Sequence, residues 1–260
     1  MNKIDRRLEK IKLENRLGLM THVVCGYPTL KESEEIVELM DKSGVDFIEM
    51  QIPFSDPLAD GPTIMRACEM ALEKGAKVKD AFEMAEELAQ KVSAPLLFMA
   101  YYNNIFKFGV EKFIKKAKEV GISGLIVPDM PIEEEDEEHF IKFCDKYGIY
   151  HIHVLSPVST EERIKKNSEV ASGFLYCTAR QGITGAKSEL DPKVGEFLKR
   201  VKKYVKVPLA VGFGISKKEH MEVLKGNVEI AVVGSVILDI INQNKGYLKK
   251  IEKFLKGLRT

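Results

Sequence analysis

The feature that most constrains the fold of this chain is a regular alternation of short apolar runs with longer amphipathic stretches. Most of the short runs are apolar at successive positions, as expected of strands that are covered on both faces. Strands that alternate with helices in this way form a parallel sheet with right-handed crossovers. Eight such runs are present, at residues 19–24, 47–52, 96–101, 124–127, 150–155, 173–177, 208–211 and 229–233.

The number of strand–helix units predicts the architecture. Eight units in 260 residues fit an α/β fold of one closed (β/α)8 TIM barrel, which typically takes about 250 residues, better than an open doubly wound sheet. Counting does not demonstrate closure, so the open sheet is the alternative. No linker divides the chain, and we expect a single domain over residues 1–260 with an extra N-terminal helix, residues 1–16, at one barrel end. The clearest amphipathic stretches are residues 30–42, 110–120, 133–147, 193–204, 216–224 and 236–242.

The charge balance limits the classes of partner. The chain has 40 Lys and Arg against 39 Asp and Glu, a formal net charge of +1, so bulk charge would hold neither a nucleic acid nor an anionic membrane. Residues 1–18 lack the apolar core of a signal peptide, and no stretch is long enough to span a bilayer. Four cysteines, far apart in sequence, suit reduced thiols. We therefore expect a cytoplasmic protein.

Several expected helix ends carry local signals. Ser216 followed by Glu219 predicts a capping box, and Thr160 predicts the start of another helix. The acidic run at residues 133–138 is typical of a solvated first helical turn, where acidic side chains complement the macrodipole. Four glycines follow helical patterns, where a left-handed residue is needed: Gly44, Gly75, Gly121 and Gly148.

The turns after the last two strands predict an anion site. In a barrel of this type the working face lies at the C-terminal ends of the strands. Gly212 and Gly214 follow the seventh strand, and Gly234 and Ser235 open the helix after the eighth. Backbone N–H groups at such turns can converge on a phosphate, so we predict a phosphorylated substrate. The alternative is that these are plain turn glycines.

Glu49 is a carboxylate within an otherwise apolar strand. Period-two alternation puts Phe47, Glu49 and Gln51 on one face, while the residues between them face the helices. A carboxyl group inside a barrel costs free energy unless it is paired or functional, and partial desolvation would raise its pKa, which suits general acid–base catalysis. A structural bond to Gln51 or to a tyrosine is the alternative. Asp60, on the following loop, can share the barrel mouth and take the other carboxylate role.

Other side chains give weaker signals for chemistry. His151 and His153 share a strand face, but no carboxylate motif at ligand spacing accompanies them, so no metal is expected. His22 in the first strand fits a catalytic group and a wall residue equally well. The serines and cysteines show no nucleophile elbow. No lysine lies within the eight strands, so covalent catalysis by lysine has no support.

A set of motifs along the whole chain together resembles one enzyme family. Residues 53–64 read Pro-Phe-Ser-Asp-Pro-Leu-Ala-Asp-Gly-Pro-Thr-Ile and follow Glu49. In register with them come Tyr102, Asn104 and residues 128–131, 182–185, 212–216 and 234–235. This pattern resembles the tryptophan synthase alpha chain family. The resemblance implies a (β/α)8 barrel that cleaves indole-3-glycerol phosphate to indole and glyceraldehyde 3-phosphate.

The resemblance also implies a partner and a role for each matching residue. The partner is a tryptophan synthase beta subunit in an α2β2 assembly; it carries pyridoxal phosphate, whereas this chain is expected to carry no cofactor. Glu49 matches the family's acid–base, Asp60 the acceptor for the indole N–H, and Tyr176 the tyrosine that lines that site. The implied substrate- and phosphate-binding residues are Tyr102, Thr184, Gly185, Phe213, Gly214, Gly234 and Ser235.

Four positions depart from the usual family pattern. His22 stands where phenylalanine is common, Tyr27 where aspartate is usual, Gln51 where glycine is usual and Ala100 where leucine is common. We expect His22, Gln51 and Ala100 to line the pocket and Tyr27 to lie at the barrel mouth. Because both carboxylates and the phosphate turns are present, a divergent lyase is the leading interpretation. The alternatives are a catalytically weak activator of a beta partner and another phosphosugar enzyme on the same barrel.

Overall fold

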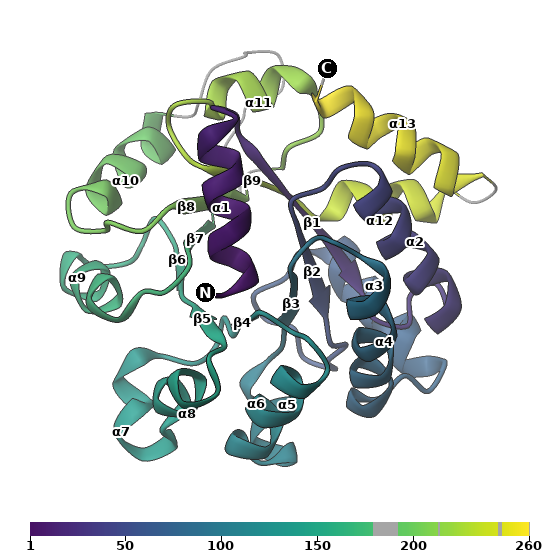
Figure 1. The fold of residues 1–260 in the computed structure, drawn as a ribbon, viewed down its shortest axis with the longest axis horizontal. Helices are drawn as coiled ribbons and strands as arrows, with labels where there is room; N and C mark the ends of the chain where they lie inside the picture. Colours follow the sequence, from purple (N-terminus) through teal and green to yellow (C-terminus); the bar gives the residue numbers. More distant parts are fainter. Residues whose placement is uncertain (179–191, 213, 244–245, 260) are drawn as a thin grey trace.

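The chain folds into a nearly closed barrel of parallel strands surrounded by helices (Figure 1). The computed structural model describes residues 1–178, 192–212, 214–243 and 246–259. Its strands are β1 (Gly18–Val24), β2 (Phe47–Gln51), β3 (Leu96–Met99), β4 (Gly124–Ile126), β5 (Tyr150–Ile152), β6 (Val154–Leu155), β7 (Leu175–Thr178), β8 (Leu209–Gly212) and β9 (Ile230–Val233). Each expected apolar run therefore contains a strand.

The order of the strands shows how the barrel closes. The sheet runs β5-β4-β3-β2-β1-β9-β8-β7-β6, and every hydrogen-bonded pair in it is parallel. The first and last members of this order, β5 and β6, are separated in the chain only by His153. β5 and β6 are thus two halves of one interrupted strand, so the barrel has eight strands. The two edges of the sheet meet at this strand. The predicted (β/α)8 barrel is confirmed, and the open sheet is excluded.

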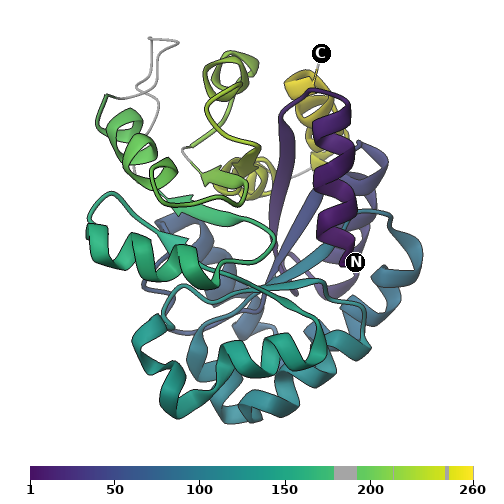
Figure 2. The same ribbon diagram turned by 60° about the vertical axis from the view of Figure 1, so that its left-hand side comes forward.

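The helices lie around the outside of the strands (Figure 2). The C-terminal helix packs beside the first helix of the barrel wall, α13 against α2, and closes the outer layer. The helices are α1 (Lys3–Leu13), α2 (Leu30–Lys42), α3 (Pro62–Glu73), α4 (Val78–Lys91), α5 (Tyr102–Phe108), α6 (Val110–Glu119), α7 (Glu135–Glu138), α8 (Phe140–Tyr147), α9 (Glu161–Val170), α10 (Pro192–Lys202), α11 (Lys218–Leu224), α12 (Ser235–Asn242) and α13 (Tyr247–Arg259), with a 3-10 turn at Ile132–Glu134.

Alternation along β2 separates two apolar layers. Ile48 and Met50 belong to the large cluster between strands and helices, whereas Phe47 belongs to the smaller cluster inside the barrel. Because neighbouring side chains of a strand point to opposite faces, Glu49 and Gln51 must follow Phe47 inward. The predicted interior position of Glu49 is confirmed.

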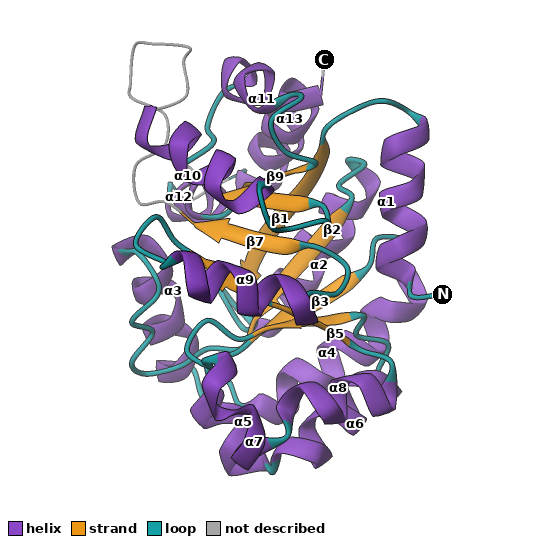
Figure 3. Cartoon of the chain, turned by 90° about the vertical axis from the view of Figure 1, so that its left-hand side faces the viewer, coloured by secondary structure: helices purple, strands orange, loops and turns teal. Residues whose placement is uncertain are grey.

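The extra N-terminal helix closes the end of the barrel at which the strands begin (Figure 3). Ile4 and Ile11 of α1 pack into the interior cluster, and Asn2 and Asp5 form a capping box at the start of the helix. After the helix, Arg16 binds both oxygens of the buried Asp46 carboxylate, at 2.6 and 2.7 Å. The catalytic face must therefore be the opposite end.

Two of the helix predictions are wrong. The first is the start of α11, which begins at Lys218 with no side-chain cap; Ser216 instead donates its backbone N–H to Nδ1 of His220 at 3.3 Å. The second is the continuous helix at residues 133–147, which is broken at His139, where φ is 55°. Like charges three and four residues apart destabilise a helix, and the acidic run ends after one turn of α7.

Other predicted ends are confirmed. The side-chain oxygen of Thr160 accepts the backbone N–H of Arg163 at 3.2 Å and caps α9. The four glycines expected in the left-handed region all have positive φ: Gly44, Gly75, Gly121 and Gly148, at 81°, 84°, 89° and 65°. Within the part of the chain that the structure describes, no helix is both long and apolar enough to cross a membrane.

Candidate active site

His22 and Glu49 lie side by side inside the barrel. Residue pairing between β1 and β2 matches His22 with Glu49, and the two residues are only 3% and 5% exposed. His22 Nδ1 is 3.5 Å from Glu49 Oε1. Burial alone would lower the pKa of His22, but the charge and hydrogen bond of Glu49, with the charge of Asp60, raise the pKa above its usual value. The pair can therefore hold a proton between an imidazole and a carboxylate.

Asp60 reaches the same end of the barrel from the loop between β2 and α3. Its Oδ2 accepts hydrogen bonds from Gln51 Nε2 at 2.7 Å and from the Tyr101 hydroxyl at 3.0 Å. Burial raises the pKa of Asp60, against the opposing effects of His22 and of these two donors. The carboxyl group is held in one orientation by two side chains, which suits an acceptor for a substrate N–H.

Tyr176 completes the group from the other side of the barrel. It packs against the interior cluster from β7, and burial, followed by the charges of Glu49 and Asp60, raises its pKa well above the usual value. Its phenol therefore stays neutral at any physiological pH. A Cβ on Gly212 of β8 would come within 3.1 Å of the Tyr176 hydroxyl, so glycine makes room for that group. The three predicted catalytic residues are thus brought together.

Three buried atoms of this group lack a hydrogen-bond partner among the described residues: His22 Nε2, Glu49 Oε2 and Gln51 Oε1. Buried polar atoms are normally hydrogen-bonded, and leaving one unpaired costs about 1–3 kcal/mol. The three atoms belong to adjacent strands, β1 and β2. Their clustering is expected of a place where a bound molecule supplies the missing bonds.

The glycine turns predicted to bind phosphate lie beside this group. Gly234 caps α12, whose first residue is Ser235. A Cβ on Gly234 would approach no protein atom closer than 3.8 Å, the nearest being His22 Cβ, so packing within the protein does not require glycine there. Gly214 has a φ of 65°, a conformation that favours glycine. Gly234 thus lies beside His22, and the anion-binding role of both turns stays a prediction.

Two further predicted contact residues lie at the ends of strands, and their substrate contacts stay predictions. Ala100 follows β3 and is fully buried. Tyr102 begins α5; its hydroxyl contacts Glu138 of α7, and its backbone N–H donates to Asp129 at 2.8 Å. Thr184, Gly185 and Phe213 lie outside the described residues, and their predicted roles are untested.

The expected place of Tyr27 at the barrel mouth needs correction. Its side chain is only 4% exposed, and its hydroxyl contacts Asn242 at the end of α12. The turn after β1 is therefore folded against the helix layer, which leaves this ring inaccessible to a substrate or a partner. His22 and Gln51, by contrast, contact Glu49 and Asp60 respectively, and their place in a substrate pocket stays a prediction.

Tyr101 is a site residue that sequence reasoning missed. Its hydroxyl donates to Asp60 and accepts the backbone N–H of Ala59, both at 3.0 Å. The available signal was alternation, because Leu97, Met99 and Tyr101 all belong to the interior cluster. Tyr101 thus continues the inward-facing row of β3 beyond the last residue of the strand.

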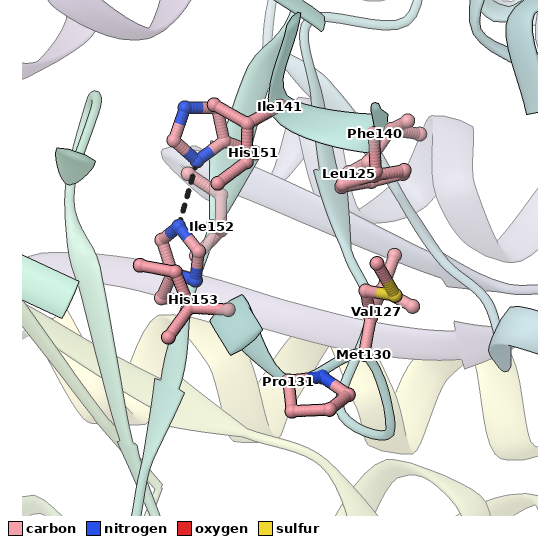
Figure 4. A pocket seen from close by; sticks show the side chains of 10 residues that line it. Leu125, Val127, Met130, Pro131, Phe140, Ile141, His151, Ile152 and His153 are labelled. Atoms are coloured by element: carbon pink, nitrogen blue, oxygen red, sulfur yellow. Dashed lines mark hydrogen bonds between the residues drawn. The ribbon is translucent and has the colours of Figure 1, made fainter. Parts of the chain in front are cut away.

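The two histidines considered as metal ligands bind each other instead. His151 Nδ1 lies 2.8 Å from His153 Nε2 (Figure 4). Burial lowers the pKa of His151 to about 4, and burial, with the neighbouring His151, lowers that of His153 to about 3. They line a cavity of about 20 Å³, which holds about one water molecule. Among the described residues, no group of three or more potential ligands could bind a metal ion.

Comparison with known proteins decides the family. The profile of the tryptophan synthase alpha chain matches residues 8–258. The chain belongs to the tryptophan synthase alpha chain family. This match confirms the resemblance read from the motifs and, with it, the predicted lyase class.

Individual relatives cover the whole chain. A tryptophan synthase alpha chain from Thermoanaerobacter sp. (strain X514) is 41% identical and covers 100% of this chain and 99% of its own. One from Methanocaldococcus jannaschii is 44% identical over 97% of this chain and 90% of its own. The crystal structure of tryptophan synthase subunit alpha from Legionella pneumophila str. Paris is 30% identical, with a TM-score of 0.89, covering 100% and 97% of the two chains. The barrel is therefore that of the tryptophan synthase alpha chain family throughout.

Proposed function

We propose that this chain cleaves indole-3-glycerol phosphate to indole and glyceraldehyde 3-phosphate, with Glu49 as acid–base and Asp60 as acceptor for the indole N–H. The observation that carries the proposal is the buried pair of carboxyl groups at one end of a barrel of this family. One is paired with His22, and the other is held by two neutral donors. Two carboxyl groups in different surroundings can take different roles in one reaction.

The arrangement accounts for both proton transfers of a retro-aldol cleavage. Asp60, as the carboxylate, accepts the indole N–H and favours the tautomer in which C3 carries a hydrogen. Glu49 supplies the proton to C3 and then, as a carboxylate, removes the proton of the glycerol hydroxyl. The bond between C3 and the glycerol carbon breaks as that hydroxyl becomes the aldehyde, and Glu49, which has given one proton and taken another, is protonated again at the end. Tyr176, kept neutral by burial, lines the ring.

Phosphate binding is assigned to the turns after β8 and β9. Backbone N–H groups of Gly234 and Ser235, at the start of an eight-residue helix, are placed to bind an anion together with the helix dipole. Gly214 contributes from the neighbouring turn. The other proposed contacts are Tyr102, Ala100, Thr184, Gly185 and Phe213.

We also propose that the partner is a tryptophan synthase beta subunit, in an α2β2 assembly, and that pyridoxal phosphate belongs to that subunit. Leu58 supports a docking surface on the catalytic loop, because its side chain is 84% exposed only two residues before Asp60. Met65 and Phe106, on α3 and α5, are further exposed apolar residues. A partner that covers Leu58 would act directly on the position of Asp60.

Two coarser features are part of the same proposal. We assign residues 1–260 to a single domain, because one sheet includes strands from Gly18 to Val233. The N-terminal helix α1 packs into the barrel interior, and the C-terminal helix α13 packs against α2, α11 and α12 of the outer layer. We place the protein in the cytoplasm, where its four buried free cysteines would stay reduced.

The deciding experiment measures indole released from indole-3-glycerol phosphate with and without a purified beta subunit. We expect slow release by the chain alone and faster release on mixing. Asp60→Asn should reduce release about 100-fold or more in both conditions, whereas Asp56→Ala and Pro57→Ala should reduce only the stimulation. Binding of the beta subunit without any release of indole would favour the activator alternative, and parallel losses in all three variants would refute separate roles within the loop.

A further inference from the structure

We propose that His22 is a positioning residue for Glu49: it holds Oε1 of the carboxyl group and stores the proton that Glu49 exchanges during the reaction. This inference rests on the proposed lyase function. It assigns Oε2 as the oxygen that acts on the substrate. His22 itself need not touch the reacting atoms.

The geometry gives the two carboxylate oxygens different surroundings. Oε1 faces His22 Nδ1 at 3.5 Å, whereas Oε2 is buried with no partner among the described residues. The backbones are fixed by the pairing of β1 with β2, in which His22 lies opposite Glu49. Strands hold catalytic groups more precisely than loops do. A rotation of the Glu49 side chain would exchange the two oxygens, and the bond from His22 opposes that rotation.

The pair can exist in two forms that share one proton. In one form His22 is an imidazolium and Glu49 a carboxylate; in the other, Nδ1 has given its proton to Oε1, so His22 is neutral and Glu49 is a carboxylic acid. The pair is in this state after Oε2 has given its own proton to the ring carbon, and either form accepts the hydroxyl proton at Oε2, which restores the starting state. Atoms and charge balance between the two, and no other reactant is needed. Without His22, Glu49 would carry an unpaired charge in the same buried place each time it loses its proton, which costs more free energy.

The other groups around His22 and Glu49 favour a proton bound between these two side chains. Asp60, from the loop after β2, raises the pKa of His22 along with Glu49. Tyr176, from β7, is neutral and adds no charge. Gln51, also neutral, binds Asp60, and the turn at Gly234 approaches His22 with its backbone only. Among the described residues near the pair, the His22 imidazole is thus the group that can carry a positive charge, and Glu49 and Asp60 are the two that can carry a negative charge.

Two substitutions of His22 separate its two proposed roles, holding the Glu49 carboxyl group and storing a proton. Asn at position 22 can still donate from about the place of Nδ1 but holds no exchangeable proton, and Phe does neither. We expect His22→Asn to lower kcat about 10-fold and His22→Phe about 100-fold, with KM changed less than about twofold in both. The pH–kcat profiles of both variants should differ from that of wild type, because the imidazole beside Glu49 is lost.

A matched control removes a buried imidazole elsewhere in the barrel. His151→Asn, on β5, should leave kcat and the pH profile unchanged, since the partners of His151 are His153 and Asp145, not Glu49 or Asp60. Thermal unfolding of all variants reports whether each is folded at the assay temperature. If wild type releases indole and both His22 variants keep kcat within twofold of wild type with the same pH profile, this inference is overturned and the proposed function stands. Absence of release by wild type would overturn the proposed function.

A second readout does not depend on turnover. The His22 ring nitrogens, followed by NMR in 15N-histidine-labelled protein, should titrate with a lower midpoint in Glu49→Gln than in wild type, because Glu49 raises the pKa of His22 against the effect of burial. Glu69→Gln, which alters an exposed ion pair on α3, should leave that midpoint in place. A midpoint that is the same in Glu49→Gln and in wild type would show that the two groups do not share a proton.

Discussion

Replacing Glu49 by Gln tests the central assignment directly. The amide has nearly the volume of the carboxyl group and keeps an oxygen that can face His22 Nδ1, now 3.5 Å from Oε1. It can neither accept nor return a proton. Loss of a general acid–base typically lowers the rate by a factor of about 10²–10⁴, which is about 2.7–5.4 kcal/mol of transition-state stabilisation at 1.36 kcal/mol per decade.

The same substitution changes how stability depends on pH. The pKa of His22 is raised in the folded chain because of Glu49 and Asp60, despite burial. A raised folded pKa stabilises the native state fully below the unfolded value, about 6.5, and this contribution is lost as the pH rises through the folded value. Glu49→Gln removes the main source of the shift. The variant should therefore lose more stability, relative to wild type, at pH 6 than at pH 9.

The assays are indole release and urea unfolding at both pH values. Each pKa unit lost at His22 corresponds to about 1.4 kcal/mol of the free energy of unfolding at low pH, which urea unfolding measures directly. Glu69→Gln makes the same chemical change at the surface and should alter neither turnover nor the pH dependence. A Glu49→Gln variant that keeps more than a tenth of wild-type kcat would refute the acid–base role. Equal stability losses at pH 6 and pH 9 would refute the charge coupling.

Three further substitutions test other parts of the structure. Tyr101→Phe removes a donor to Asp60 and the acceptor for a backbone N–H; we expect kcat/KM to fall about 10-fold and the free energy of unfolding by about 1–3 kcal/mol, and an unchanged kcat/KM would contradict it. Gly234→Val should weaken binding of glycerol 3-phosphate about 10-fold or more without affecting indole, as calorimetry would show; equal affinity would disprove the anion site. Asp46→Asn breaks the pair that the buried Asp46 forms with the partly exposed Arg16 and should cost about 1–3 kcal/mol in urea unfolding, so a loss below about 1 kcal/mol would refute a stabilising role.

The barrel could be predicted because its pattern is local. Alternation along β2 assigns Phe47 and Glu49 to the interior from the sequence alone, since neighbouring side chains of a strand must point to opposite faces. Family motifs located the two carboxylates, the tyrosine of β7 and the glycine turns. Thr160 was predictable as a cap because capping depends on residues three positions apart.

Other features depended on contacts between distant segments. The role of Tyr101 comes from its meeting with Asp60, 41 residues earlier in the chain, and the burial of Tyr27 comes from Asn242, 215 residues away. No local pattern records such meetings.

The sequence by itself thus determined the parallel barrel, the family and the two carboxyl groups, because periodicity and motifs are properties of neighbouring residues. Only the tertiary structure decided which groups surround each carboxyl group. The pairing of β1 with β2 sets His22 against Glu49, and the folding of the loop brings Asp60 to Gln51 and Tyr101. Proton affinity in a buried site depends on desolvation and on charges a few ångströms away, and these are fixed only when the strands pair.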